Sequence, residues 1–200
     1  MSLRFKHAVW MLVSVVGLSL PAPSRAAAEP RYTYIEGGWI HADFDNVNED
    51  GDGWGIGGSY AFHKNFHFVA DYQDIDLGGS NDASALTFGI GGNLPLRSGL
   101  DAVGRVRWVH EEIDAGNSDH DDDGYGLEAG LRLIINPQLE LDGSVNYVDV
   151  GDSDNTSFVI GGLYEIANNF ALGGDIEFSD DVTALFLKAR FYFNPPSQMR

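Results

Sequence analysis

Apolar and polar residues alternate along most of this chain, in runs of about ten residues that follow one another closely. The run from Gly53 to Phe62 shows the pattern well. One face reads Trp54, Ile56, Gly58, Tyr60 and Phe62, and the other reads Gly55, Gly57, Ser59 and Ala61. Successive side chains of a β-strand point to opposite faces, so a period of two predicts strands with one apolar face. The sequence therefore predicts an all-β fold.

Aromatic residues lie near both ends of these apolar faces, whereas the opposite faces carry charges and glycines. A soluble sandwich or a lipocalin-like barrel would instead turn its apolar face inward. Strands that face lipid outside and a polar interior inside are typical of outer-membrane barrels, which carry an aromatic girdle at each interface. The residues predicted to form the girdles are Trp39, Trp54, Phe62, Phe66, Tyr72, Trp108, Tyr125, Tyr147, Phe170, Phe178 and Phe193.

The connections between the predicted strands alternate in length. Those at 63–65, 95–99, 136–138 and 167–169 are tight, and the other five are expected to be longer and acidic. Short periplasmic turns opposite longer outer loops are typical of transmembrane barrels, whose strand number is usually even. We predict a closed antiparallel up-and-down transmembrane β-barrel of about ten strands, with eight as the alternative.

The first residues have the pattern of a secretory signal peptide. Arg4 and Lys6 are basic, Ala8 to Leu20 is mostly apolar, and small residues lead to Ala28. A 13-residue apolar stretch makes about 20 Å of helix, too short to cross a membrane. We therefore expect a signal peptide over 1–28, cleaved after Ala27 or Ala28, a barrel over 29–193 and a short tail over 194–200. Such a chain is expected in the cell outer membrane of a Gram-negative bacterium.

The formal net charge of −18 makes nucleic-acid binding improbable, because phosphate backbones would be repelled. Much of this charge falls in the predicted outer loops. Asp119, Asp121 and Asp123 match the first half of an EF-hand calcium loop, but Gly130 stands where the closing Glu belongs. We keep these three aspartates as a weak metal-site hypothesis. No cofactor is expected beyond loosely bound Ca²⁺ or Mg²⁺, which could bridge loop carboxylates to anionic lipid phosphates.

Charged residues within the strands fall on the inward-facing phase. The predicted interior network comprises Glu36, Asp71, Arg105, Arg107, Glu128, Arg132, Glu140, Asp142, Glu165, Asp175, Glu177, Lys188 and Arg190. If adjacent strands pair about their connections, Arg107 lies near Glu128 and Asp175 lies diagonal to Lys188. In a narrow barrel, both signs together favour ion pairs that plug the interior. The alternative is a charged constriction that selects solutes.

The stretch Tyr32-Thr33-Tyr34-Ile35-Glu36-Gly37-Gly38-Trp39, followed by Gly53-Trp54-Gly55, Gly58-Ser59-Tyr60-Ala61-Phe62 and Asn65-Phe66-His67, resembles a known family. It is similar to the opening of small outer-membrane barrels of the OmpA-transmembrane-domain and OmpX-like group. The resemblance implies export through the periplasm and folding by the barrel assembly machinery. It also implies contact with outer-membrane lipids and lipopolysaccharide, roles in envelope integrity, adhesion or host contact, and no catalytic residue.

Three function classes follow. The first is a plugged structural or surface-interaction barrel whose acidic loops contact an extracellular ligand. The second is a narrow porin-like channel for cations or small polar solutes. The third is a membrane enzyme at the outer rim, a protease or a lipid-modifying enzyme, built on His41 with Asp43, His110 with Glu111, or His120. A histidine beside a carboxylate is expected by chance in such acidic segments, so we expect no enzyme.

Overall fold

The structure is a computed structural model, and it describes residues 29–44, 49–78, 81–115, 118–180 and 182–193. The side chains of residues 49, 115, 118 and 119 lie outside this description. Ten strands make up the barrel: β1 (Tyr34–Phe44), β2 (Glu49–His63), β3 (Phe66–Asp76), β4 (Asn81–Arg97), β5 (Leu100–Ala115), β6 (Ser118–Asn136), β7 (Leu139–Val150), β8 (Ser153–Ala167), β9 (Phe170–Phe178) and β10 (Val182–Tyr192).

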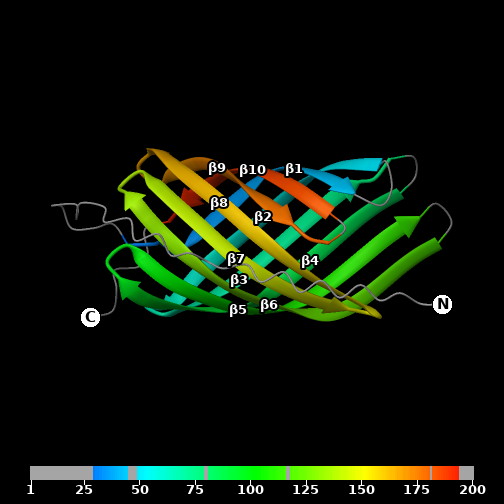
Figure 1. The fold of residues 1–200 in the computed structure, drawn as a ribbon, viewed down its shortest axis with the longest axis horizontal. Coiled ribbons are helices and arrows are strands. Elements are labelled where there is room, and N and C mark those ends of the chain that lie inside the picture. Colours follow the sequence, from blue (N-terminus) through cyan, green and yellow to red (C-terminus); the bar gives the residue numbers. More distant parts are fainter. Residues whose placement is uncertain (1–28, 45–48, 79–80, 116–117, 181, 194–200) are drawn as a thin grey trace, which may run out of the picture.

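Each strand pairs antiparallel with its neighbour in sequence, and β1 pairs with β10 to close the barrel (Figure 1). Closure leaves no open edge where all ten strands are paired on both sides, which satisfies the backbone hydrogen bonds of that part of the barrel without water. The prediction of a closed barrel of about ten strands is confirmed, and the alternative of eight is wrong.

Tight turns join the strands at one end of the barrel, which is the end where β1 begins and β10 ends. The turn before Leu100 needs a left-handed backbone, which Gly99 supplies with a φ of 76°. Asn169 takes a similar φ of 74° in the turn between β8 and β9. These four turns match the predicted short connections, so this end is the periplasmic one in the outer-membrane pattern.

The outer connections differ from the prediction, because they are short as well. β5 and β6 remain paired up to Ala115 and Ser118. The acidic residues predicted to form the outer loop between these strands, Glu112, Asp114, Asp119 and residues 121–123, therefore lie in the strands themselves. Inward-facing Val109 and Ile113 continue the alternation past Trp108, which explains why the ladder continues. The acidic segments are therefore strand extensions that project beyond the rest of the rim (Figure 1).

Ten of the eleven predicted girdle residues lie on the outward phase of their strands, and Phe193, which follows β10 directly, is 48% exposed. Trp39 is paired with Trp54 and Trp108 with Tyr125 near the outer end, and Trp54, for example, is 50% exposed. Phe62 and Phe66 flank the β2–β3 turn at the periplasmic end, where Phe62 also packs on Phe68. Since the aromatic rings form two bands with aliphatic residues between them, the outer surface matches a lipid-facing zone.

No helix among the described residues is long and apolar enough to cross a membrane. The predicted signal peptide over 1–28 and the tail over 194–200 lie outside the described residues, so both remain predictions.

Candidate functional site

The lumen is the candidate site, and its middle is filled by charged side chains. Arg105 lies directly across the β5–β6 ladder from Glu128 and forms an ion pair of 3.0 Å with it. Arg107 reaches the same carboxylate at 3.8 Å and also donates to Asn146 Oδ1 at 3.3 Å. The predicted proximity of Arg107 and Glu128 is therefore confirmed.

A second chain of ion pairs crosses the lumen. Lys188 on β10 pairs with Asp175 on β9 and with Glu36 on β1 at 3.7 Å. Arg190 pairs with the same Glu36 at 2.7 Å. From there Arg190 reaches Glu140 on β7 at 3.7 Å, and Glu140 also pairs with Arg132 on β6. These groups come from five strands on different sides of the barrel, so the network crosses the lumen in its periplasmic half. The predicted diagonal contact of Asp175 with Lys188 is confirmed.

Glycines on the inward faces make room for these charges. A Cβ on Gly57 would lie 2.3 Å from Asp71 Oδ1, and one on Gly91 would lie 2.1 Å from His67 Nε2. Such distances are sterically impossible, so a side chain on the neighbouring strand occupies the space that the glycine leaves. The charged side chains can then lie against the wall instead of standing upright in the lumen.

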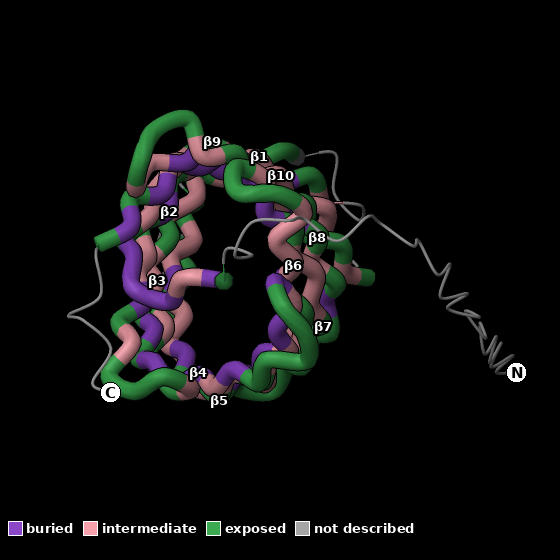
Figure 2. The backbone as a smooth tube through the Cα atoms, turned by 90° about the vertical axis from the view of Figure 1, so that its left-hand side faces the viewer, coloured by how far each residue is buried: buried purple, intermediate pink, exposed green. Residues whose placement is uncertain are grey.

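The segment before β1 lies in the periplasmic mouth. The alternation over residues 32–42 predicts a first strand that begins at Tyr32, but the ladder begins at Tyr34, and in the end-on view of Figure 2 the described chain starts inside the barrel. Tyr32 is buried, stacks on the ring of His67 at 4.8 Å and donates from Oη to Asp101 at 2.8 Å. Ser59 Oγ donates to the Tyr32 carbonyl at 2.8 Å.

Arg31 fastens the same segment to the opposite wall. Its guanidinium pairs with Glu165, lies over the Tyr192 ring at 3.7 Å and donates to Asn169 Oδ1 at 3.3 Å. Arg132 in turn donates to the Arg31 carbonyl at 3.2 Å. Glu165 lies on the inward face, as the alternation predicts, but its partner Arg31 could not be predicted from that pattern. Period two places Tyr32 in a strand as well, because it does not show where a ladder begins.

The outer half of the lumen has a different lining from the middle. Beyond Trp39 the inward residues of β1 are Ile40, Ala42 and Phe44, and beyond Trp108 those of β5 include Val109 and Ile113. They line a cavity of about 680 Å³ that extends to the outer connections. The sequence analysis expected a polar interior throughout. The apolar lining could have been predicted from the sequence, because these apolar residues occupy the same alternate positions along β1 and β5 as the inward-facing charged residues.

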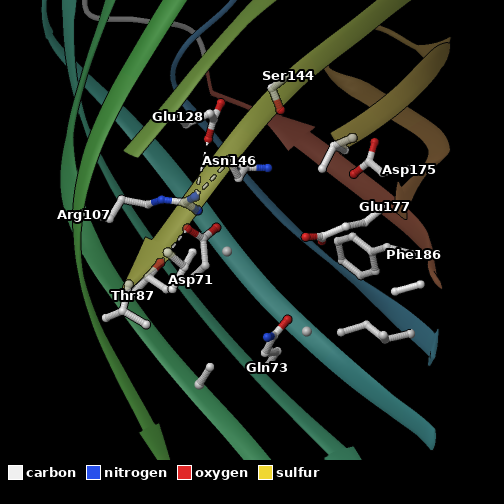
Figure 3. A pocket seen from close by; sticks show the side chains of 18 of the residues that line it. Asp71, Gln73, Thr87, Arg107, Glu128, Ser144, Asn146, Asp175, Glu177 and Phe186 are labelled. Carbon is white, nitrogen blue, oxygen red and sulfur yellow. Dashed lines mark hydrogen bonds and ion pairs between the residues drawn. The ribbon is translucent and has the colours of Figure 1, made fainter. Parts of the chain in front are cut away.

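The floor of this cavity carries more acids than bases (Figure 3). Among the described residues, each inward Lys or Arg forms at least one ion pair. Asp71, Asp142 and Glu177 line the same cavity, and none of the Lys and Arg residues that the structure describes lies within ion-pair distance of them. Asp71 accepts a hydrogen bond from Thr87 Oγ1 at 3.1 Å. The carboxylates of Asp142 and Asp175 lie together against Gly161, where a Cβ would fall 2.8 and 2.0 Å from their oxygens.

The outer surface of the extensions is acidic. Asp52, Asp76, Asp82 and Asp114 are successive cross-strand partners on β2 to β5, so like charges lie in one row. Of the three residues proposed for a metal site, Asp121 and Asp123 are exposed on β6, and the side chain of Asp119 lies outside the described residues. Among the described residues no cluster of three or more suitable side chains could hold a metal ion. The metal hypothesis remains untested.

Of the histidines that could have served an enzyme, His110 has a different carboxylate partner from the predicted one. His41 Nδ1 lies 2.9 Å from Asp52 Oδ1, and His41 Nε2 lies 3.6 Å from Asp43. His110 contacts Asp123 at 3.0 Å and not Glu111, because Glu111 falls on the inward phase.

His120 Nε2 lies 2.8 Å from Asp122. The His41 and His110 pairs lie on separate hairpins, with β3 and β4 between them, so they do not converge on one substrate.

These features define a class: a ten-stranded membrane-spanning barrel with ion pairs across its lumen and an outer cavity. The chain belongs to the outer membrane protein beta-barrel domain family, whose model matches residues 11–165. It is thus a multi-pass protein of the cell outer membrane. A search by sequence among curated proteins gives no match.

Solved structures of similar fold include a porin, NanC, with 7% identity, a TM-score of 0.52, and coverage of 80% of this chain and 100% of that one. Neisserial surface protein A matches with 16% identity, a TM-score of 0.43 and coverage of 80% and 96%. The attachment invasion locus protein Ail of Yersinia pestis matches with 14% identity, a TM-score of 0.45 and coverage of 82% and 100%. At such identities these likenesses concern the fold alone.

Proposed function

We propose that this protein is a closed surface barrel, which acts through its extracellular face and does not conduct solutes in its resting state. The observation that carries the proposal is the docking of residues 29–33 inside the periplasmic end of the lumen. That segment adds Arg31 and Tyr32 to a layer already crossed by the Glu36–Arg190–Glu140 ion pairs. A solute that enters from outside reaches the cavity and then meets this layer.

The test is single-channel conductance of the refolded protein that starts at Glu29, in a planar bilayer. We expect no steady current, although the protein shows the gel-mobility shift on heating that marks a folded barrel. Steady ion-selective current from the folded protein would refute a closed resting state and support the porin-like alternative.

The alternative of a narrow cation channel has one observation in its favour. Residues 29–33 are anchored by side chains and three backbone contacts rather than by a strand ladder, so they could leave the lumen without breaking the barrel. The unpaired carboxylates of the cavity would then favour cations. Removal of residues 29–33 from the folded protein should produce cation-selective current if this alternative holds.

The acidic extensions supply the rest of the proposed surface role. They lie just beyond the outer aromatic girdle, at the height of lipopolysaccharide phosphates, and Ca²⁺ or Mg²⁺ could bridge the two sets of anions. We keep lipopolysaccharide and an extracellular ligand as proposed partners, and the barrel assembly machinery as the partner during folding. A divalent-dependent difference in binding to lipopolysaccharide vesicles would test the first of these.

A further inference from the structure

We propose that the outer cavity binds a small organic cation that has an apolar body. This inference goes beyond the surface role, because it assigns a ligand class to the inside of the barrel. The cavity of about 680 Å³ falls in the range of small-molecule sites, which is roughly 300–1,000 Å³. It is closed below by the ion-pair layer and reaches the outer connections above, so a ligand has access from outside the cell.

The upper walls fit an apolar body. Ile40, Phe186 and Ala184 face the cavity from β1 and β10, and Val148 and Val159 face it from β7 and β8. Gly55 widens it at the same height, since a Cβ there would lie 3.2 Å from Ile40 Cδ1 and 3.7 Å from Phe186 Cζ. Apolar residues are not required here for lipid contact, because this face points away from the membrane. Burial of an apolar ligand would remove their exposed surface from water.

The floor fits a cationic group. Asp142 and Asp175 converge over Gly161, and Asp175 alone of the two is paired with a cation, Lys188. Asp175 Oδ1 is buried and has no hydrogen-bond partner among the described residues. Glu177 follows on the same face of β9, beside Phe186 in Figure 3. Asp142 and Glu177 line the cavity, so an ammonium group beside them would neutralise part of the excess negative charge.

Charge also argues against an anionic ligand. Five cations line the cavity, Arg105, Arg107, Arg132, Lys188 and Arg190, and each of them is held by a carboxylate of the barrel. The acidic row on the outer surface would further repel an anion and draw a cation toward the mouth. The occupant is therefore an amphipathic cation rather than a fatty acid or a phosphate ester.

The experiment uses the full barrel in lipid nanodiscs and three probes of one shape: 4-phenylbutylamine, 4-phenylbutan-1-ol and 4-phenylbutyrate. Methyl chemical shifts report where each probe lies. We expect the amine to shift the methyl signals of Ile40, Val159 and Ala184, with at least tenfold higher affinity than the alcohol and the acid. Shifts confined to the outward Val145 would mean partition into lipid only and would overturn the proposal, as would equal binding of all three probes.

Two sets of variants test separately the contacts proposed for the apolar body of the ligand and those proposed for its ammonium group. Ala184→Trp fills the cavity and should abolish the shifts, whereas Ala189→Trp, on the lipid face of the same strand, should not. If Ala184→Trp does not fold, Ala184→Leu provides the smaller block. Asp142→Asn with Glu177→Gln should lower amine affinity about tenfold and leave alcohol affinity unchanged. An unchanged amine affinity would overturn the assignment of the head group. Since binding is measured without current, these results do not depend on whether the barrel conducts.

Discussion

Tyr32→Ala should release the segment that closes the periplasmic mouth. The ring is buried, stacks on His67 at 4.8 Å, lies under the Arg132 guanidinium at 4.6 Å and donates to Asp101 at 2.8 Å. Truncation of a packed aromatic side chain to Ala costs about 3–5 kcal/mol, so we take about 4 kcal/mol for the loss of docking free energy. At about 1.4 kcal/mol per factor of ten, the undocked fraction rises roughly a thousandfold.

The assay is the frequency of channel openings in planar bilayers, with folded barrel quantified by gel mobility. Tyr32→Phe keeps the stacking and loses only the hydrogen bond to a charged acceptor, which costs about 1.5–3 kcal/mol, so its openings should be much rarer. Tyr60→Ala removes a tyrosine from the lipid face and should stay closed. If Tyr32→Ala is folded yet as silent as the wild type, Tyr32 does not hold the mouth shut. If Tyr32→Phe opens as often as Tyr32→Ala, the hydrogen bond to Asp101 holds the segment and the packing of the ring does not.

Three further changes follow from the lumen and the rim. Glu140→Gln leaves the buried Arg132 without its anion and should lower the free energy of unfolding by about 3–5 kcal/mol, measured by urea titration in lipid vesicles. Gly91→Ala places a methyl group against the His67 ring and should cost about 1–3 kcal/mol, most of which a second change, His67→Ala, should restore. Asp76→Asn removes a charge that faces an acid on each side and should stabilise the rim by about 0.5 kcal/mol, visible as slower amide exchange in low salt.

Each change has a matched control. Glu165→Gln affects a half-buried pair and should cost much less than Glu140→Gln; equal losses would contradict the role given to burial. Gly104→Ala should be nearly neutral, because its Cβ would meet only Glu128 O at 3.7 Å. The benefit of Asp76→Asn should shrink as salt or Mg²⁺ is added; a constant benefit would mean that it is not electrostatic.

Much of the barrel could be predicted from the sequence, because period two and turn chemistry act locally. The inward phase of Lys188 and Arg190, the outward phase of Trp39 and the position of the β2–β3 turn all follow from residues within one hairpin. The partners across the lumen could not be found this way. Arg190 meets Glu140 because the barrel closes, and a closed ring brings together residues that no hairpin relates.

The predictions for the outer connections and for the first residues of the barrel were wrong, because composition and alternation do not show where backbone pairing begins or ends. Acidic composition suggested loops around Glu112 and Asp121, yet backbone pairing continues there while inward Ile113 keeps the strand pattern. Tyr32 carried the same alternation as the strand that follows, but both ladders of β1 begin at Tyr34, and the contacts of Tyr32 with His67 and Asp101 place its ring inside the lumen.

The docked segment at the periplasmic mouth also imposes an order on folding. Arg31 contacts Glu165 and Tyr192, and Tyr32 contacts Asp101, so its binding site exists only once distant parts of the chain have assembled. Contacts of such large sequence separation form late, because the loops that join them must close first. The earliest residues of the barrel domain are therefore the last to take their place. Until then the nascent lumen stays open to water from the periplasm, which gives its charged side chains time to find their partners while still hydrated.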